Sequence, residues 1–156
     1  MLYLLEHGFV NRLIPWYQHD PKTVEENNHV KILWNFTIQT DHHIAHIKPD
    51  LIVIDKDRNE ANIIDIAVPN DYRIAQKRLE KIRNYTTLAG EIKTLWKLSK
   101  VKIIPIIIGA MGSMYKQFDD DIEKLGLTNN KFSKNEGQKI ALLGTAHIVR
   151  SFLQIA

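Results

Sequence analysis

The sequence contains no cysteine among its 156 residues. A disulfide framework and a thiolate zinc site are therefore excluded, and stability has to come from packing. No stretch approaches the roughly 18 to 20 uninterrupted apolar residues that a helix needs to cross a bilayer. The first residues, Met1 to His7, also lack the pattern of a secretion signal. These absences predict an intracellular protein without a membrane partner.

Two common catalytic patterns are missing as well. Residues 109–112 (Gly-Ala-Met-Gly) follow a predicted strand but lack the third glycine of a dinucleotide-binding fingerprint. No Gly-x-Ser-x-Gly sequence is present, which removes the usual serine-hydrolase interpretation. His42, His43 and His46 lie in a predicted loop without matching ligands elsewhere, so we interpret them as solvated loop residues and not as a zinc site.

The composition is that of an ordinary soluble globular protein. Hydrophobic residues make up 44% of the chain and charged residues 25%, which excludes disordered and collagen-like classes. A chain of 156 residues has the length of one domain. We therefore expect a single domain over residues 1–156, with its core over 20–126 and a polar linker plus a final helix over 127–156.

Positive charge is concentrated in one segment, although the net charge of the chain is only +3. Residues 71–102 contain three acids and nine basic residues, namely Arg73, Lys77, Arg78, Lys81, Arg83, Lys93, Lys97, Lys100 and Lys102. Such an excess is typical of a phosphate-facing surface. A solvated helix face is the alternative, and charge alone leaves both interpretations open.

Hydrophobic periodicity predicts alternating helices and strands. Helices are expected over residues 3–17, 20–28, 71–98, 115–125 and 138–153. Strands are expected over residues 30–40, 48–54, 62–68 and 101–109. This order predicts an α/β or α+β core with a mixed sheet of about four strands flanked by helices, in the order αβββαβ followed by C-terminal helices.

Two carboxylates occupy neighbouring predicted strands, Asp50 at the start of one apolar run and Asp65 within the next. An acid in a strand that is apolar on both sides is costly unless it is paired or binds a cation. Fourteen residues lie between the two acids, which fits two strand halves joined by a six-residue turn. The two side chains are therefore expected to converge at a strand edge. Paired carboxylates suit Mg²⁺ or Mn²⁺, which keep positions for water and a phosphate.

Lys48-Pro49-Asp50 followed by Asp65-Ile66-Ala67 resembles the PD-(D/E)xK nuclease core. The wider strings VKILWNFTIQTD, KPDLIVIDK, IIDIAVPND and VKIIPIIIGAMG are similar to the restriction-enzyme-like endonuclease domain of non-LTR retrotransposons, in the C-terminal region of their reverse transcriptase open reading frame. The resemblance runs from about residue 26 to residue 125, and more loosely to 142–146. It implies a nuclease-type fold with Asp50 and Asp65 as metal ligands and catalytic acids.

One position departs from the family pattern, because Ala67 stands where a lysine usually follows the second acid. Relatives can supply this amine from the next helix, where Lys77, Lys81 and Tyr85 share one stripe at four-residue spacing. The resemblance makes Lys81 the first candidate for the amine and Lys77 the second, with Tyr85 as a hydrogen-bond donor. Solvated lysines beside a packed tyrosine are the alternative, which the spacing leaves open.

The resemblance adds Glu26 as a candidate third metal ligand on a first core helix, although surface glutamates are more often plain solvated charges. Lys48, Arg73 and Arg78 are the candidate nucleic-acid-binding side chains.

The resemblance implies a Mg²⁺- or Mn²⁺-dependent DNA endonuclease. Its role would be to nick the target DNA of a retrotransposon, either within the element's protein or as a separated remnant of it. Such an enzyme is nuclear if it acts on chromosomal DNA. A catalytically inactive domain that binds nucleic acid or protein, and a junction-resolving nuclease, are the alternatives. The sequence does not decide the oligomeric state.

Overall fold

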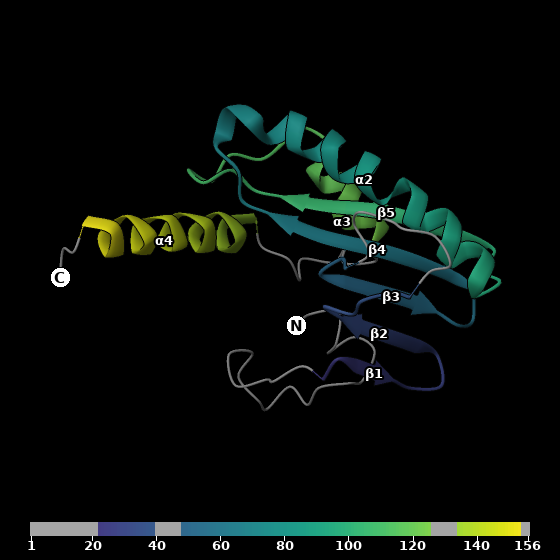
Figure 1. Cartoon of the computed structure of the whole chain (residues 1–156). Helices are drawn as coiled ribbons and strands as arrows, with labels where there is room; N and C mark the ends of the chain where they lie inside the picture. The colour runs from purple at the N-terminus through teal and green to yellow at the C-terminus, as the bar shows by residue number, and fades with distance from the viewer. Residues whose placement is uncertain (1–21, 40–47, 126–133, 154–156) are drawn as a thin grey trace. The chain divides into compact units, whose positions relative to one another are not determined.

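The computed structural model describes residues 22–39, 48–125 and 134–153, and Figure 1 shows its ribbon. The strands are β1 (Val24–Glu26), β2 (Val30–Trp34), β3 (Leu51–Asp55), β4 (Glu60–Ala67) and β5 (Lys100–Ile107). The helices are the 3-10 helix η2 (Asp71–Arg73) and the α-helices α2 (Ile74–Leu95), α3 (Phe118–Lys124) and α4 (Lys134–Leu153). The expected mixture of helices and strands is confirmed in this general form. None of the described helices has the length and apolar character that a bilayer-crossing segment requires.

The five strands form one mixed sheet in the order β1-β2-β3-β4-β5. Successive strands from β1 to β4 pair antiparallel. After α2 the chain returns as β5 beside β4, and both strands run in the same direction (Figure 1). Backbone bonds from Ser99 N to Asn59 O (2.8 Å) and from Ile108 N to Ala67 O (3.2 Å) follow this parallel alignment. A parallel neighbour requires such a crossover, which explains why the long helix stands between these two strands.

The chain divides into two compact units. The first comprises residues 1–65 and 81–105, and the second comprises residues 66–80 and 106–156. Both β4 and α2 contribute residues to each unit.

The core of the first unit lies between the sheet and α2. Ile52 and Ile63, on β3 and β4, are fully buried together with Leu88 and Ile92 of α2. Residues 85, 88 and 92 recur at three- and four-residue spacing, so they form one face of the helix. Side chains alternate along a strand, so the face that carries Ile63 also carries Asp65. The sheet face that bears Asp65 is therefore the one that α2 covers.

In the second unit, Asp71 anchors the loop that follows β5. Its carboxylate accepts hydrogen bonds from Met111 N (2.9 Å) and from the Ser113 hydroxyl. A Cβ atom added at Gly109 would lie 2.2 Å from Asp71 Oδ1, so only glycine lets the loop approach this closely. Gln138 and Thr145 of α4 donate to the Gly112 and Ala110 carbonyls of the same loop (2.8 and 2.9 Å).

Several predicted boundaries need correction. The predicted helix over 20–28 is wrong within the described residues, because Val24–Glu26 form strand β1. Asn27 explains the difference, since its Oδ1 accepts hydrogen bonds from His29 N (2.9 Å) and Val30 N (2.8 Å) and so closes a turn between β1 and β2. The final helix begins at Lys134, four residues earlier than predicted. The predicted helix over 3–17 lies outside the described residues.

Candidate functional site

Asp65 is one of only two charged side chains that are buried among the described residues, with 4% of its surface exposed. Tyr85 donates a hydrogen bond from its hydroxyl to Asp65 Oδ1 at 2.8 Å. Lys81 brings its ammonium against the other oxygen, Oδ2. Lys81 and Tyr85 are one helical turn apart on α2, so both side chains reach Asp65 from the helix that covers this face of the sheet. The structure thus brings three of the predicted site residues together within the first unit.

Asp50 lies at the start of β3, and the strand register aligns it with Asp65. The β3–β4 ladder pairs Leu51 with Ile64, so one further step places Asp50 opposite Asp65. Asp50 O also accepts a hydrogen bond from Asn35 N (2.9 Å), which extends the β2–β3 ladder to the same position. Residues directly opposite in an antiparallel pair point to the same face, with Cβ atoms about 4.5 to 5.5 Å apart. The register therefore aligns both acids on the face that α2 covers.

Asp65 and Asp50 both influence the pKa of the Tyr85 hydroxyl. Burial raises the pKa of Tyr85 well above its usual value, and the hydrogen bond to Asp65 and the negative charges of Asp65 and Asp50 raise it further. Tyr85 therefore remains a neutral hydrogen-bond donor at physiological pH. The influence of Asp50 on this phenol agrees with the position that the register gives it.

The donor set at these acids fits a hard divalent cation. Two carboxylates supply only oxygen ligands, which Mg²⁺ and Mn²⁺ prefer. Within the described part of the chain, no three His, Cys, Asp or Glu side chains are grouped so that they could hold a metal ion. Mg²⁺ is commonly bound by one or two carboxylates together with water and substrate phosphate, so two acids are sufficient for such a site.

Glu26 does not join these acids. It lies on β1 and not on a helix, and its carboxylate forms ion pairs with Lys56 (2.6 Å) and Lys31 (3.4 Å). The hydrogen bond from Lys56 is the main cause that lowers the pKa of Glu26. The register aligns Glu26 with Ala61 of β4, three strands away. Since Ala61 precedes Asp65 by four residues, the two acids are separated by about 13 Å along the strand direction alone.

The other two predicted cations of α2 have protein partners in the second unit. Lys77 donates to Glu80 Oε1 at 2.7 Å. Arg78 donates to Asp121 Oδ2 from two nitrogens (3.0 and 2.8 Å), and its guanidinium lies 5.2 Å from the centre of the Tyr115 ring. Arg78 therefore links α2 to the buried acid of α3, and its role in binding nucleic acid stays a prediction.

Asp121 is the second buried acid and was missed by sequence reasoning. Besides Arg78, it accepts hydrogen bonds from Tyr115 (2.9 Å) and Lys124 (2.6 Å). Burial alone would raise the pKa of Asp121, but the hydrogen bonds from Lys124, Arg78 and Tyr115 outweigh it and hold this pKa below its usual range. The three-residue spacing of Asp121 and Lys124 is the only local signal of this cluster.

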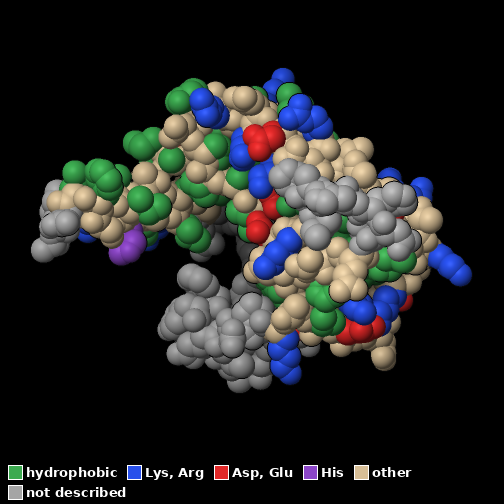
Figure 2. Space-filling view, viewed as in Figure 1, with side chains coloured by type: hydrophobic (Ala, Val, Ile, Leu, Met, Phe, Trp, Pro, Cys, Tyr) green, Lys and Arg blue, Asp and Glu red, His purple; other side chains and the backbone are tan. Residues whose placement is uncertain are grey.

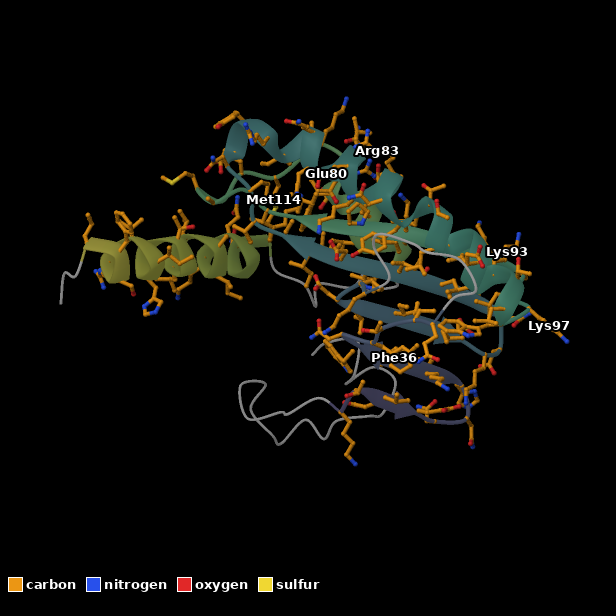
Figure 3. All side chains as sticks on the ribbon, in the orientation of Figure 1. Phe36, Glu80, Arg83, Lys93, Lys97 and Met114 are labelled. Atoms are coloured by element: carbon orange, nitrogen blue, oxygen red, sulfur yellow. The ribbon has the colours of Figure 1, made fainter. Side chains whose placement is uncertain are left out.

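Exposed basic side chains are available outside these pairs. Arg73 is exposed and lines a pocket of about 310 Å³ together with Asn70, Gln76 and the paired Lys77 and Glu80. Lys48 is also exposed, two residues before Asp50. Figure 3 shows Arg83 and Lys93 along α2 and Lys97 just beyond its end. On the face shown in Figure 2, basic side chains are interspersed with acidic ones.

Comparison of the chain with protein-family models, with curated proteins and with solved structures gives no match. The resemblance to the PD-(D/E)xK core therefore stays a prediction.

Proposed function

We propose that the chain is a Mg²⁺- or Mn²⁺-dependent DNA endonuclease that hydrolyses phosphodiester bonds, with a core of the PD-(D/E)xK type. The observation that supports this proposal most directly is the arrangement around Asp65. Extending the β3–β4 register by one step beyond Leu51 and Ile64 aligns Asp50 with it, and Lys81 and Tyr85 of α2 contact its carboxylate. In this proposal Lys81 takes the place of the lysine that is absent at position 67. As the resemblance implies, the nuclease nicks the target DNA of a retrotransposon.

Each side chain has a distinct role in this proposal. Asp50 and Asp65 would hold the cation, which when bound lowers the pKa of water and neutralises negative charge on the phosphate. Lys81 supplies a positive charge beside the acids, suited to stabilising charge that develops on phosphoryl oxygens. Tyr85 fixes the orientation of the Asp65 carboxylate through Oδ1 and stays protonated while it does so.

Binding of the DNA backbone is assigned to exposed basic groups. Lys48 and Arg73 retain this role from the sequence prediction, because both are exposed. The pocket that Arg73 lines also contains the amide groups of Asn70 and Gln76, which are able to donate to phosphate oxygens, whereas Lys77 and Glu80 in its wall pair with each other. Since contacts of this kind release counterions, binding is expected to weaken as the salt concentration rises.

A nicking assay on supercoiled plasmid with Mg²⁺ or Mn²⁺ tests the proposal. We expect the purified chain to convert supercoiled DNA to open circles, and Asp50→Asn and Asp65→Asn to lose this activity. Asp57→Asn is the matched control, because Asp57 is an exposed acid in the β3–β4 turn of the same hairpin. Loss of cleavage in all three variants, or in none, would contradict the assignment of the site.

A catalytically inactive nucleic-acid-binding domain is the second candidate, and one observation favours it. Tyr85 and Lys81 occupy both oxygens of Asp65, which is also how a purely structural buried ion pair is built. DNA binding in a gel-shift assay, without cleavage in either metal, would support this candidate over the nuclease.

A further inference from the structure

The cationic position beside Asp65 is already filled by the protein itself. Lys81 places its ammonium on Asp65 Oδ2, the oxygen that Tyr85 leaves open. The Asp65 side chain is 5% exposed, whereas that of Lys81 is 21% exposed. The carboxylate is therefore held inside the protein, while the lysine stem reaches solvent and has a path outward.

A divalent cation and an ammonium group compete for such a position. Both are attracted by the same carboxylate, and two positive charges a few ångströms apart repel each other strongly where water is excluded. A neutral donor does not compete in this way, so the Tyr85 hydroxyl can keep its bond to Oδ1 when the charge at Oδ2 changes. Lysine is suited to leaving, because its charge is carried on a flexible four-carbon stem.

We propose that Lys81 is an internal competitor for the cation: its ammonium neutralises Asp65 in the unloaded protein and has to leave Oδ2 when a divalent ion binds. This inference rests on the proposed metal-dependent function. Through it, the same side chain stabilises the buried acid before loading and becomes available to the substrate phosphate afterwards. Lys81 thereby sets how tightly the site binds metal, in addition to its role beside the phosphate.

Mn²⁺ binding without DNA tests this competition separately from activity. Titration calorimetry would be performed on the full chain and on Lys81→Met, with Lys93→Met as the matched control. Lys93 is an exposed lysine of the same helix. We expect Lys81→Met to bind Mn²⁺ roughly tenfold more tightly than the unchanged chain, because no ion pair has to be broken. Lys93→Met should bind as the unchanged chain does.

Thermal unfolding supplies a second readout. Lys81→Met removes the ammonium group that pairs with the Asp65 carboxylate. Without metal, the melting temperature of this variant should therefore be lower than that of the unchanged chain. Saturating Mn²⁺ should then raise the melting temperature of Lys81→Met by more than it raises that of the unchanged chain. If Lys81→Met does not fold, Lys81→Gln removes the charge while keeping a polar side chain and carries the same two measurements.

Two results would overturn the inference, and they differ in what they say about the nuclease. Equal or weaker Mn²⁺ binding by Lys81→Met, with binding abolished by Asp65→Asn, would show a metal site without competition and leave the proposed function standing. Absence of Mn²⁺ binding in the unchanged chain and in Lys81→Met, together with absence of plasmid nicking, would reject both.

Discussion

Replacement of Tyr85 by phenylalanine isolates the hydrogen bond that orients Asp65. The ring stays in the core, so the change removes one hydroxyl and opens no large cavity. Tyr85 and Asp65 are each 4% exposed, and their oxygens are 2.8 Å apart. Hydrogen bonds to charged groups contribute about 1.5 to 3 kcal/mol, and an acceptor left unsatisfied in the interior adds its desolvation cost. We therefore expect Tyr85→Phe to lower the free energy of unfolding by about 2 kcal/mol.

For a protein of this size, such a loss corresponds to a decrease in melting temperature of about 4 to 8 °C. Urea unfolding followed by circular dichroism measures the free energy directly. Tyr115→Phe is the matched control, since Tyr115 also donates to a buried carboxylate (2.9 Å). Asp121 Oδ2 keeps two hydrogen bonds from Arg78 in that variant, so its loss should be at most about 1 kcal/mol. Equal losses in the two variants, or a loss below about 0.5 kcal/mol for Tyr85→Phe, would refute the reasoning.

Two further predictions concern stability in the rest of the chain. Gly90→Ala should raise the free energy of unfolding by about 0.5 to 1 kcal/mol, because Gly90 is inside α2 with no atom within 4 Å of an added Cβ. Gly109→Ala should instead lower the free energy of unfolding by about 1 to 3 kcal/mol, because the added Cβ clashes with Asp71. Urea unfolding of both variants checks the opposite signs, and a loss in Gly90→Ala would contradict the first. The depressed pKa of Asp121 contributes stability that is present above its unfolded value near 3.9 and is lost as the pH falls through its folded value. Asp121→Asn should therefore reduce stability at neutral pH and flatten its decline below about pH 4, as measured by melting temperature against pH.

The parts of the fold that the sequence predicted are those with regular spacing. Alternation along β3 and β4 placed Asp65 on the same face as Ile63, and the helical period of α2 predicted that Lys81 and Tyr85 share one stripe. Both features follow from backbone geometry alone, because side chains repeat every two residues in a strand and every 3.6 in a helix. The length of the hairpin also predicted that Asp50 and Asp65 approach each other, although the turn over residues 56–59 is two residues shorter than predicted.

The parts that could not be predicted depend on partners far along the chain. Arg78 binds Asp121, 43 residues later, and no local pattern connects them. The segment around Glu26 has an acidic, polar composition that suits a helix as well as a strand, so its pairing with β2 decides its conformation. Tertiary contacts of this kind override local propensity. The sequence alone therefore does not predict whether a basic side chain of a helix faces solvent or pairs with an acid elsewhere in the chain.

Asp50 separates the two interpretations of the buried acid on physical grounds. Tyr85 donates to Asp65 Oδ1 and Lys81 forms an ion pair at Oδ2, so a structural ion pair needs no second carboxylate. Like charges directly opposite each other in a sheet are destabilising, and the register aligns Asp50 with Asp65 in that way. A second acid at this position adds its oxygens to those of Asp65, which is what a cation site requires once Lys81 has left Oδ2.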